Sequence, residues 1–224
     1  TITDGLNDRH FSIWSSHGRY YDVNKGYWKW QRPNLFGTTE DLYTQTIVIP
    51  YLLPMLENAG AVVISPRERD WQKQEVIVDN DNPKITGIIS YSEVNNKKKW
   101  ETIEGSGFAY HQGTYADGEN PFIAGSVRKI KSRKRNSKLS YVAYQPNIPE
   151  DGDYAVYVSY KTIKKSVDDA EYIVFHKGQE THFRVNQQMG GGTWVYLGTF
   201  AFDKGCNIFN RVILTNHSKH RGVV

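Results

Sequence analysis

The sequence has few cysteines and no long apolar run, and each shortage excludes a class of protein. One cysteine, Cys206, stands among 224 residues, so no internal disulfide framework can form. We expect Cys206 to be a small buried hydrophobe beside a turn. The longest apolar clusters, "TIVIPYLLPML" and "AGAVVI", are shorter than the roughly 20 residues that a membrane-spanning helix needs. The N-terminus lacks the basic and then apolar pattern of a secretion signal, so we expect that any export signal was removed or never included.

Aromatic and charged residues are well represented. Aromatics make up 13% of the chain and charged residues 23%, with a formal net charge of +4. This composition is typical of a soluble, strand-rich protein whose rings face solvent or sugar. The length is enough for one large domain or two small ones, with a well-buried core in either case.

The first 70 residues alternate strand and helix signals. Residues 10–14, "HFSIW", predict a strand, and residues 61–64, "AVVI", predict another. Between them, residues 40–59 predict a helix with Thr38 or Thr39 as N-cap and Gly60 as the stop. Pro50 and Pro54 each remove a backbone donor, so we expect a kink or break there. This order is the opening of a parallel α/β sheet.

From residue 75 onward, short alternating runs and turns predict a β-sandwich or barrel. "YAVYVSY" and "HFRVNQQ" alternate as strands with one buried face do, and we expect them to be central strands of an antiparallel sandwich. "FHKGQETHFRV" predicts a hairpin that turns at Lys177-Gly178. Trp194 follows a glycine run and should be largely buried between the sheets, so its truncation should cost about 3 to 5 kcal/mol.

This second part resembles the golvesin C-terminal-like domain, a β-sandwich module of bacterial extracellular proteins. The resemblance rests on "AVYVSY", then "EYIVFHKGQETHFRVNQQMGGGTWVYLGTFAF", then "RVILTN", in that order over most of residues 75–224. In that family the last strand continues past "GVV", so the resemblance implies that the strand is cut short in this chain.

The first part resembles the opening of zinc-dependent N-acetylmuramoyl-L-alanine amidases, in particular a group that carries a golvesin-like insert. The resemblance rests on the strand before "SHG", the Glu that opens the helix at "TEDLYTQ", and "LENAGAVVISPRERD" with its Arg-x-x-Asp ending. It implies that His17 is the first zinc ligand and Glu40 the second. The loop between them is longer than in the simpler enzymes, and "WSSHG" replaces a glycine-proline turn of their motif.

The predicted fold class is therefore an α/β fragment followed by an all-β domain. Residues 1–70 would form the N-terminal part of a partial parallel, amidase-like α/β sheet. Residues 75–224 would form an antiparallel β-sandwich inserted into it.

A zinc site at His17 and Glu40 is chemically sensible but incomplete. Catalytic zinc commonly takes three protein ligands from His and carboxylate and keeps one position for water. Ligands that follow a strand and open a helix meet at the carboxyl edge of an α/β sheet. From spacing alone, a loop histidine and a helix-capping acid are the favoured interpretation, which the resemblance reverses. The histidines of the second part, none of which stands in the context expected of a third ligand, are His111, His176, His182, His217 and His220.

Residues near His17 are candidates for a groove that binds glycan and peptide, with aromatic faces against sugar rings. Packing of these rings onto their own domain is an equal alternative. The predicted substrate-binding residues are Arg19, Tyr20, Tyr21, Trp28, Trp30 and Arg32.

Three further stretches carry weaker signals. "RKIKSRKRNSK", residues 128–138, holds seven Lys and Arg residues without interleaved aromatics, which favours a solvated hairpin or an anionic envelope polymer over nucleic acid. "VDNDNP" at 78–83 and "ADGEN" at 116–120 offer oxygen ligands for calcium, although turns use the same residues. "MGGGTW" at 189–194 lacks the features of a phosphate loop and predicts a tight connection between strands.

The predicted function is zinc-dependent hydrolysis of the N-acetylmuramoyl-L-alanine amide bond of peptidoglycan. This chain alone should be inactive, with zinc weakly bound or absent, because the third ligand and the catalytic Glu are not in it. The alternative is a non-catalytic extracellular glycan-binding or adhesion module. A polysaccharide lyase is a third class, for which no Tyr/His/Arg arrangement is visible.

The expected partners are peptidoglycan or another envelope glycan and the remainder of the polypeptide, with no nucleic acid and no membrane span. The expected location is secreted, periplasmic or at the surface of a Gram-negative bacterium.

Overall fold

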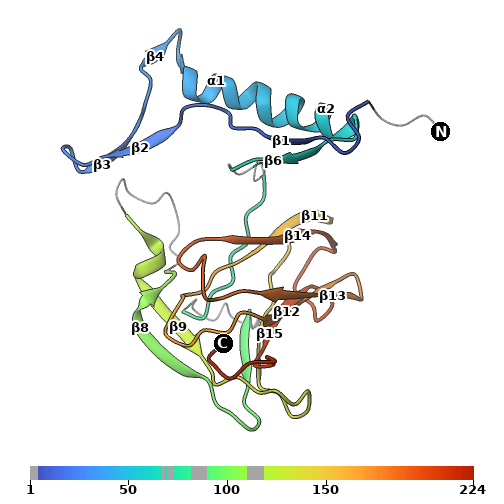
Figure 1. Cartoon of the computed structure of the whole chain (residues 1–224). Coiled ribbons are helices and arrows are strands. Elements are labelled where there is room, and N and C mark those ends of the chain that lie inside the picture. Colours follow the sequence, from blue (N-terminus) through green and yellow to red (C-terminus); the bar gives the residue numbers. More distant parts are fainter. Residues whose placement is uncertain (1–4, 67–68, 70–72, 82–89, 110–118) are drawn as a thin grey trace. The chain divides into compact units, whose positions relative to one another are not determined.

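A computed structural model describes residues 5–66, 69, 73–81, 90–109 and 119–224 (Figure 1). The chain divides into two compact units. Unit 1 comprises Thr1–Gln72 and Ala116–Glu119, and unit 2 comprises Lys73–Tyr115 and Asn120–Val224. Within the described residues, no helix is both long and apolar enough to cross a membrane.

Unit 1 is built on a strand, helix, strand arrangement. Strand β1 (His10–Ser12) pairs in parallel with β6 (Val62–Ile64). The connection contains α1 (Glu40–Ile47), the π-helical segment η1 (Val48–Leu52) and α2 (Leu53–Asn58). The predicted order of elements is thus observed, although two parallel strands do not by themselves make an amidase fold.

The ends of this helical connection follow from local sequence chemistry. Thr39 is the N-cap, and its Oγ1 accepts a hydrogen bond from Leu42 N at 3.3 Å. Gly60, just past the end, has a φ of +93°, which glycine adopts without a steric penalty. The predicted interruption at Pro50 is observed as the π-helical turn, because a residue without an N–H cannot continue the regular bonding pattern.

Two short hairpins lie between β1 and α1. Strand β2 (Arg19–Asp22) pairs with β3 (Tyr27–Trp30), and β4 (Asn34–Leu35) pairs with β5 (Thr38–Thr39). The long loop expected between His17 and Glu40 is therefore partly folded.

Unit 2 is dominated by an antiparallel five-stranded sheet in the order β13-β12-β15-β10-β7. Its strands are β7 (Tyr91–Val94), β10 (Tyr141–Tyr144), β12 (Ala170–His176), β13 (Gln179–Val185) and β15 (Arg211–Thr215). Two antiparallel pairs accompany it: β11 (Gly152–Val158) with β14 (Val195–Phe202), and β8 (Glu101–Gly107) with β9 (Gly125–Lys129). A 3-10 turn, η2 (Pro121–Ile123), precedes β9.

The core of unit 2 lies between the five-stranded sheet and the β11–β14 pair. Val142, Tyr172 and Leu214 of the larger sheet share one apolar cluster with Val158 of β11, and Val195 and Leu197 of β14 pack against it. Val174 and Phe202 centre a second cluster between the same elements. The predicted β-sandwich is therefore confirmed, with no helical segment longer than η2 in the described part of unit 2.

The prediction of central strands was wrong, whereas the predicted hairpin is confirmed. Strand β13 lies at the edge of its sheet and β11 belongs to a two-stranded pair. Alternation of apolar and polar residues indicates that one face of a strand is buried. Edge strands and central strands both have such a face, so alternation does not distinguish them. The β12–β13 hairpin turns at Lys177 (φ +47°) and Gly178 (φ +77°), the two positive values of a type I′ turn.

Candidate functional site

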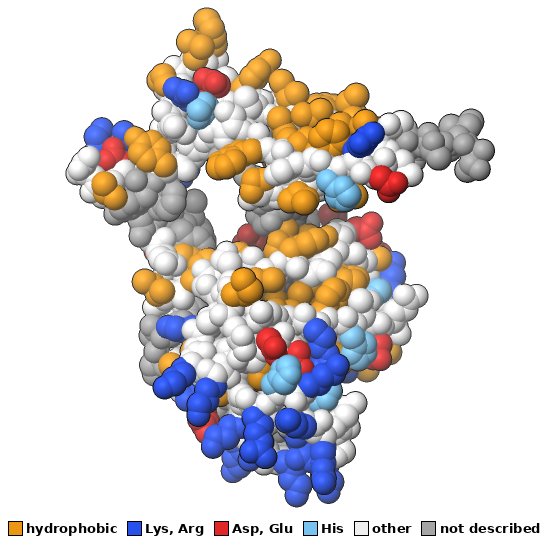
Figure 2. Space-filling model, in the orientation of Figure 1, with side chains coloured by type: hydrophobic (Ala, Val, Ile, Leu, Met, Phe, Trp, Pro, Cys, Tyr) orange, Lys and Arg blue, Asp and Glu red, His pale blue; other side chains and the backbone are white. Residues whose placement is uncertain are grey.

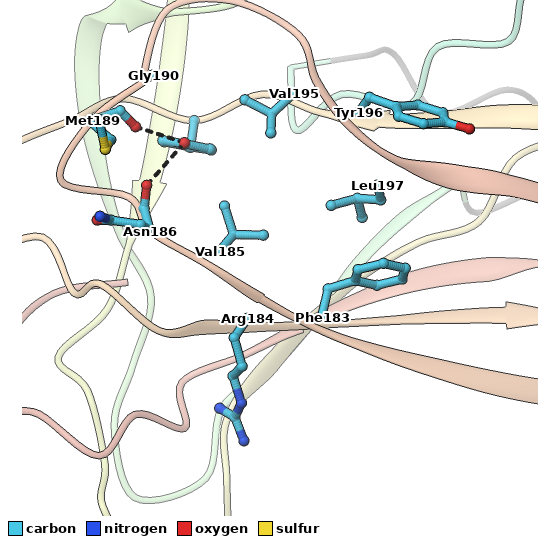
Figure 3. Close-up of a pocket in the computed structure, with 10 residues that line it drawn as sticks. Phe183, Arg184, Val185, Asn186, Met189, Gly190, Val195, Tyr196 and Leu197 are labelled. Atoms are coloured by element: carbon cyan, nitrogen blue, oxygen red, sulfur yellow. Dashed lines mark hydrogen bonds between the residues drawn. The ribbon is translucent and has the colours of Figure 1, made fainter. Parts of the chain in front are cut away.

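An apolar groove of about 380 Å³ opens in unit 2 between β13 and β14 (Figure 3). Phe183 and Val185 of β13 line one side, and Val195 and Leu197 of β14 line the other. Arg184 points away from these side chains, as Figure 3 shows, because alternate residues of a strand face opposite sides. The remaining lining residues are Tyr160, Asn186, Met189, Gly190 and Tyr196.

The loop that closes one end of this groove is held in place. The Tyr160 hydroxyl lies 2.8 Å from Met189 O and 3.2 Å from Asn186 O, so it bridges two backbone acceptors of the loop (Figure 3). Gly191 approaches the Thr162 backbone so closely that a Cβ there would meet Thr162 N at 2.4 Å. The connection predicted at residues 189–194 is observed, and it presents the exposed Met189 side chain at the rim.

Three aromatic side chains form a surface beside the groove, here called the aromatic surface: Tyr157, Trp194 and Tyr196. Tyr157 of β11 and Tyr196 of β14 are register partners with ring centroids 5.3 Å apart. Tyr196 is 54% exposed and Trp194 is 39% exposed. Exposed rings on paired strands are fixed contact area that a ligand can use without ordering them first.

The expected burial of Trp194 was therefore wrong. Val195 and Leu197 face the core, so Trp194 and Tyr196 alternate to the outer side. The indole packs against Phe108 and Phe122, at centroid distances of 5.0 and 5.7 Å, and still leaves 39% of the residue exposed. The buried tryptophan of unit 2 is Trp100.

Two of the candidate histidines lie around one buried carboxylate on the opposite side of β13. Glu171 accepts hydrogen bonds from Arg184 Nη2 at 2.8 Å and from Thr215 Oγ1 at 2.9 Å. His217 Nδ1 lies 3.4 Å from this carboxylate and His182 Nδ1 lies 3.9 Å from it. A carboxylate with these partners is satisfied within the fold, so the cluster supports structure rather than a reaction.

His220 belongs to a possible cation-ligand group with Asp168 and Asp169, whose ligand atoms lie within 4.8 Å of one another in the described chain. His220 Nδ1 lies 2.5 Å from Asp168. Asp169 accepts hydrogen bonds from the Ser218 hydroxyl and from Lys219 N. Burial raises the pKa of Asp169, but these hydrogen bonds outweigh it and lower the pKa overall. The carboxylate oxygens that a cation would need are thus already engaged by hydrogen-bond partners within the protein.

The other histidine candidates contribute no further ligand group in the described part of the chain. The His176 ring lies tilted against the Phe200 ring, with centroids 4.8 Å apart, and its Nε2 hydrogen-bonds to Thr181 Oγ1 within the same hairpin. His111 lies outside the described residues, as do residues 82–83 and 116–118 of the two calcium candidates.

In unit 1, Arg32 lies between the two predicted zinc ligands. Arg32 Nη2 donates to His17 Nε2 at 2.9 Å, and Arg32 Nε lies 3.9 Å from Glu40 Oε2. Because Arg cannot accept, Nε2 must be the unprotonated nitrogen of His17, and Nδ1–H donates to Gln31 Oε1 at 3.1 Å. His17 and Glu40 are therefore brought to one guanidinium, through which they are connected.

Next to them, the structure places a buried acid that sequence reasoning missed. Asp41 is 0% exposed, and its Oδ2 accepts from Arg32 N at 2.9 Å while Oδ1 has no hydrogen-bond partner among the described residues. Ser15 Oγ is likewise buried without a partner there. The acidic pair Glu40-Asp41 was the available signal, but helix position alone does not reveal which of two neighbouring acids points inward.

The other predicted substrate-binding residues share one hairpin. Arg19 lies over the Trp30 ring at 5.2 Å, and Lys29 lies over the Tyr20 ring at 5.3 Å. Tyr21 and Trp28 are register partners on the same hairpin. The Trp30 and Tyr20 rings thus each lie under a cation of their own hairpin. Arg67 and Asp70, the ends of the Arg-x-x-Asp pattern, lie outside the described residues.

Comparison with known proteins assigns the family of unit 2. Residues 104–224, more than half of the chain, match the Golvesin C-terminal domain. The chain belongs to the golvesin C-terminal domain family. The groove, the aromatic surface and the Glu171 cluster all use side chains of this golvesin domain.

Two similar proteins are both xanthan lyases. The chain is 34% identical over 64 residues to xanthan lyase of Bacillus sp. (strain GL1), which covers 29% of this chain and 7% of that protein. A solved structure of Paenibacillus xanthan lyase matches 66% of this chain and 12% of its own, at 24% identity and a TM-score of 0.47. The chain thus spans a small part of the length of each relative.

Proposed function

We propose that the golvesin domain is a polysaccharide-binding module of an extracellular, carbohydrate-active protein. Sugar rings would dock on the aromatic surface, with the apolar groove beside it accepting ring faces or substituents. The observation that carries the proposal is the exposure of Trp194, which directly precedes β14, and of Tyr196, near the start of β14. The names of the xanthan lyases support a role near polysaccharide, without fixing which one.

Binding of polysaccharides by the whole chain tests this proposal. Xanthan, peptidoglycan and a neutral glucan are titrated against the native protein and against Tyr196→Ala and Trp194→Ala. Each substitution is expected to weaken binding by about tenfold, as loss of an aromatic contact residue does. Phe209→Ala, which removes an equally exposed ring outside the groove, is the control and should bind as the native protein does. A native protein that binds none of the polysaccharides would overturn the proposal.

The same proposal gives a location and partners. A polysaccharide-binding module works where such polymers are, so we expect the protein to be secreted, periplasmic or on the cell surface of a Gram-negative bacterium. Its expected partners are peptidoglycan or another envelope glycan. Fractionation of cells that carry the full-length gene, followed by immunodetection, would contradict this if the protein were recovered with the cytoplasm.

A second candidate function, hydrolysis of the N-acetylmuramoyl-L-alanine amide bond, is favoured by one specific contact. Arg32 reaches both His17 and Glu40, so the two side chains lie near one point. Their donor types fit zinc, but two donors are fewer than the three that catalytic zinc takes, and Arg32 already engages His17 Nε2. A bound zinc would polarise the amide carbonyl and lower the pKa of a water. The described residues hold such an ion only together with further ligands from the remainder of the polypeptide.

Metal analysis tests the second candidate. This chain should take up less than one equivalent of zinc and leave muropeptides intact, while a longer polypeptide that adds a third ligand should bind about one zinc and release the peptide. His17→Ala should abolish both results in the longer protein. Full muropeptide cleavage by the longer His17→Ala protein would refute the amidase candidate without touching the polysaccharide proposal.

A further inference from the structure

Basic side chains from four separate segments gather at one end of unit 2. Figure 2 shows Lys and Arg side chains concentrated at the lower end of the molecule. We call this set the basic face: Lys97, Lys98, Lys99, Lys131, Arg133, Lys134, Arg135, Lys138, Lys164, Lys165, Lys219 and Arg221. The sequence pointed only to residues 128–138, because the other segments come together through the fold.

Hydrogen bonds hold the first two segments side by side. Ser140 Oγ donates to Lys98 O at 2.6 Å and accepts from Asn96 N at 2.9 Å. Asn96 Nδ2 donates to Leu139 O at 2.6 Å. Ser140 is 0% exposed, so this link is sheltered from water. The lysines of residues 97–99 therefore stay next to Lys138.

The other two segments are fastened in the same way. Ser132 Oγ donates to His220 O at 2.8 Å and accepts from Gly222 N at 2.8 Å, which fixes the segment of Lys219 and Arg221 beside residues 131–133. Val223 N donates to Lys165 O at 2.8 Å, which brings in the fourth segment. The basic face is thus a fixed assembly, whose order costs a ligand little entropy.

Among the described residues, no carboxylate pairs with the side chains of this face. In the described part of the chain, none of its twelve side chains lies within 4 Å of a carboxylate, whereas nearby Arg128 pairs with Glu93 at 2.6 Å and Lys129 with Glu101 at 3.7 Å. Asp168 and Asp169 lie at its margin but are engaged by His220 and by Ser218 and Lys219 N. Concentrated like charge raises the local potential and attracts polyanions.

The chemistry of the face favours an acidic polysaccharide over other polyanions. None of the large hydrophobic side chains exposed in the described residues belongs to its four segments, so it offers no ring for base stacking and no apolar wedge for a lipid surface. Nine of its twelve cations are Lys, whereas nucleic-acid recognition draws on Arg forks. We propose that the basic face binds the carboxylate groups of an acidic polysaccharide. The proposal rests on the proposed function only in taking the polymer to be a carbohydrate.

A matched pair of polymers tests the proposal on the whole chain. Polygalacturonate and its fully methyl-esterified form share one backbone, but only the first carries carboxylates. The native protein should bind polygalacturonate at least about tenfold more tightly at low salt, and raising NaCl to about 0.5 M should abolish the difference, since exposed charges are then screened.

Two double variants locate the site. Lys134→Gln/Arg135→Gln should weaken polygalacturonate binding by about tenfold and leave thermal stability and binding to the esterified polymer unchanged. Lys177→Gln/Lys204→Gln removes the same charge from exposed positions outside the face and should change binding by less than about twofold.

The outcomes separate this proposal from the proposed function. Equal binding of the two polymers, or an equal effect of the two double variants, would refute carboxylate binding by the basic face. It would not affect the proposed binding of sugar rings by the aromatic surface. Tighter binding to a duplex DNA or to vesicles of anionic lipid than to polygalacturonate at the same salt would assign the face to that polyanion instead. If the native protein binds none of the polysaccharides, both proposals are rejected.

Discussion

Both units of this chain contain helices or strands with clear local sequence signals. They differ sharply in how many apolar side chains they bury. In unit 2, sixteen of the apolar side chains in the described residues are buried, including Trp100, Val142 and Leu214, whereas in unit 1 only Leu53 and Ala61 are. Unit 1 instead exposes many of the apolar side chains of its helical segments: Leu42, Tyr43, Ile47, Tyr51, Leu52 and Met55. Clear caps and turns can therefore specify local structure without supplying the burial that stabilises a domain.

The largest expected difference is between the isolated units. Residues 73–224 alone should unfold cooperatively in urea with a free energy of about 5 kcal/mol, while residues 1–72 alone should show no cooperative transition, because a piece of this size with few buried side chains is marginal. Far-UV circular dichroism during urea titration measures both. Cooperative unfolding of residues 1–72 would contradict the conclusion that this unit buries too little apolar surface to fold alone.

Matched leucine truncations sharpen the contrast within the whole chain. Leu214 is 6% exposed in the unit 2 core, and Leu53 is 0% exposed in unit 1. Leu214→Ala should lower the unfolding free energy of unit 2 by about 3 kcal/mol, whereas Leu53→Ala should leave that transition where it was. The denaturant midpoints of both variants, monitored by near-UV circular dichroism, measure these shifts. A shift caused by Leu53→Ala would show that the two units unfold together.

Two tryptophans of unit 2 provide a smaller test. Trp100 is 6% exposed and Trp194 is 39% exposed. Trp100→Ala should therefore cost about 3 to 5 kcal/mol, and Trp194→Ala only about 1 to 2 kcal/mol, because part of the indole is already in water. Thermal melts of the two variants compare them, and equal losses would show that Trp194 belongs to the core.

The smallest effect concerns Asp79 and depends on pH. Burial raises the pKa of Asp79 to about 6, and the nearby Asp81 carboxylate adds to the rise. The folded state then favours the protonated acid, so the contribution of Asp79 to stability is present below about pH 4 and is lost as pH rises through 6.

Replacement of Asp79 by Asn tests this pH dependence. Asp79→Asn should stabilise unit 2 by about 1 kcal/mol at pH 7.5 and by almost nothing at pH 4, allowing for partial solvent screening. Melts at the two pH values measure the difference, with Asp153→Asn, an exposed acid, as control. A gain that is equal at both pH values would rule out titration as its cause.

Local features of the fold could be predicted because their causes lie within a few residues. Thr39 and Gly60 mark the helix ends, and Lys177-Gly178 marks the hairpin turn, by the chemistry of those residues alone. The strand order could not be predicted, since β7 pairs with β10 and β10 with β15 across long stretches that carry no pairing signal.

The sites depend on long-range packing in the same way. The basic residues of segment 128–138 can be recognised in the sequence. The segments next to them in the basic face are set by the hydrogen bonds of Ser140 and Ser132, which ordinary polar patterns do not single out. Likewise His17 and Glu40 could be named in advance, whereas the position of Arg32 between them requires the fold of the intervening hairpins.

The π-helical turn at Val48–Leu52 also sets the rotational phase of helix α2. Each residue advances an α-helix by about 100°, so a turn that holds one extra residue swings every later side chain by about that angle. Leu53, which is fully buried in the described part of unit 1, comes directly after this turn, between the exposed Leu52 and the half-buried Pro54. Deleting one residue from the turn would straighten the helix and rotate Leu53 out of its place, so the length of this turn is as much a determinant of the interior as the leucine itself.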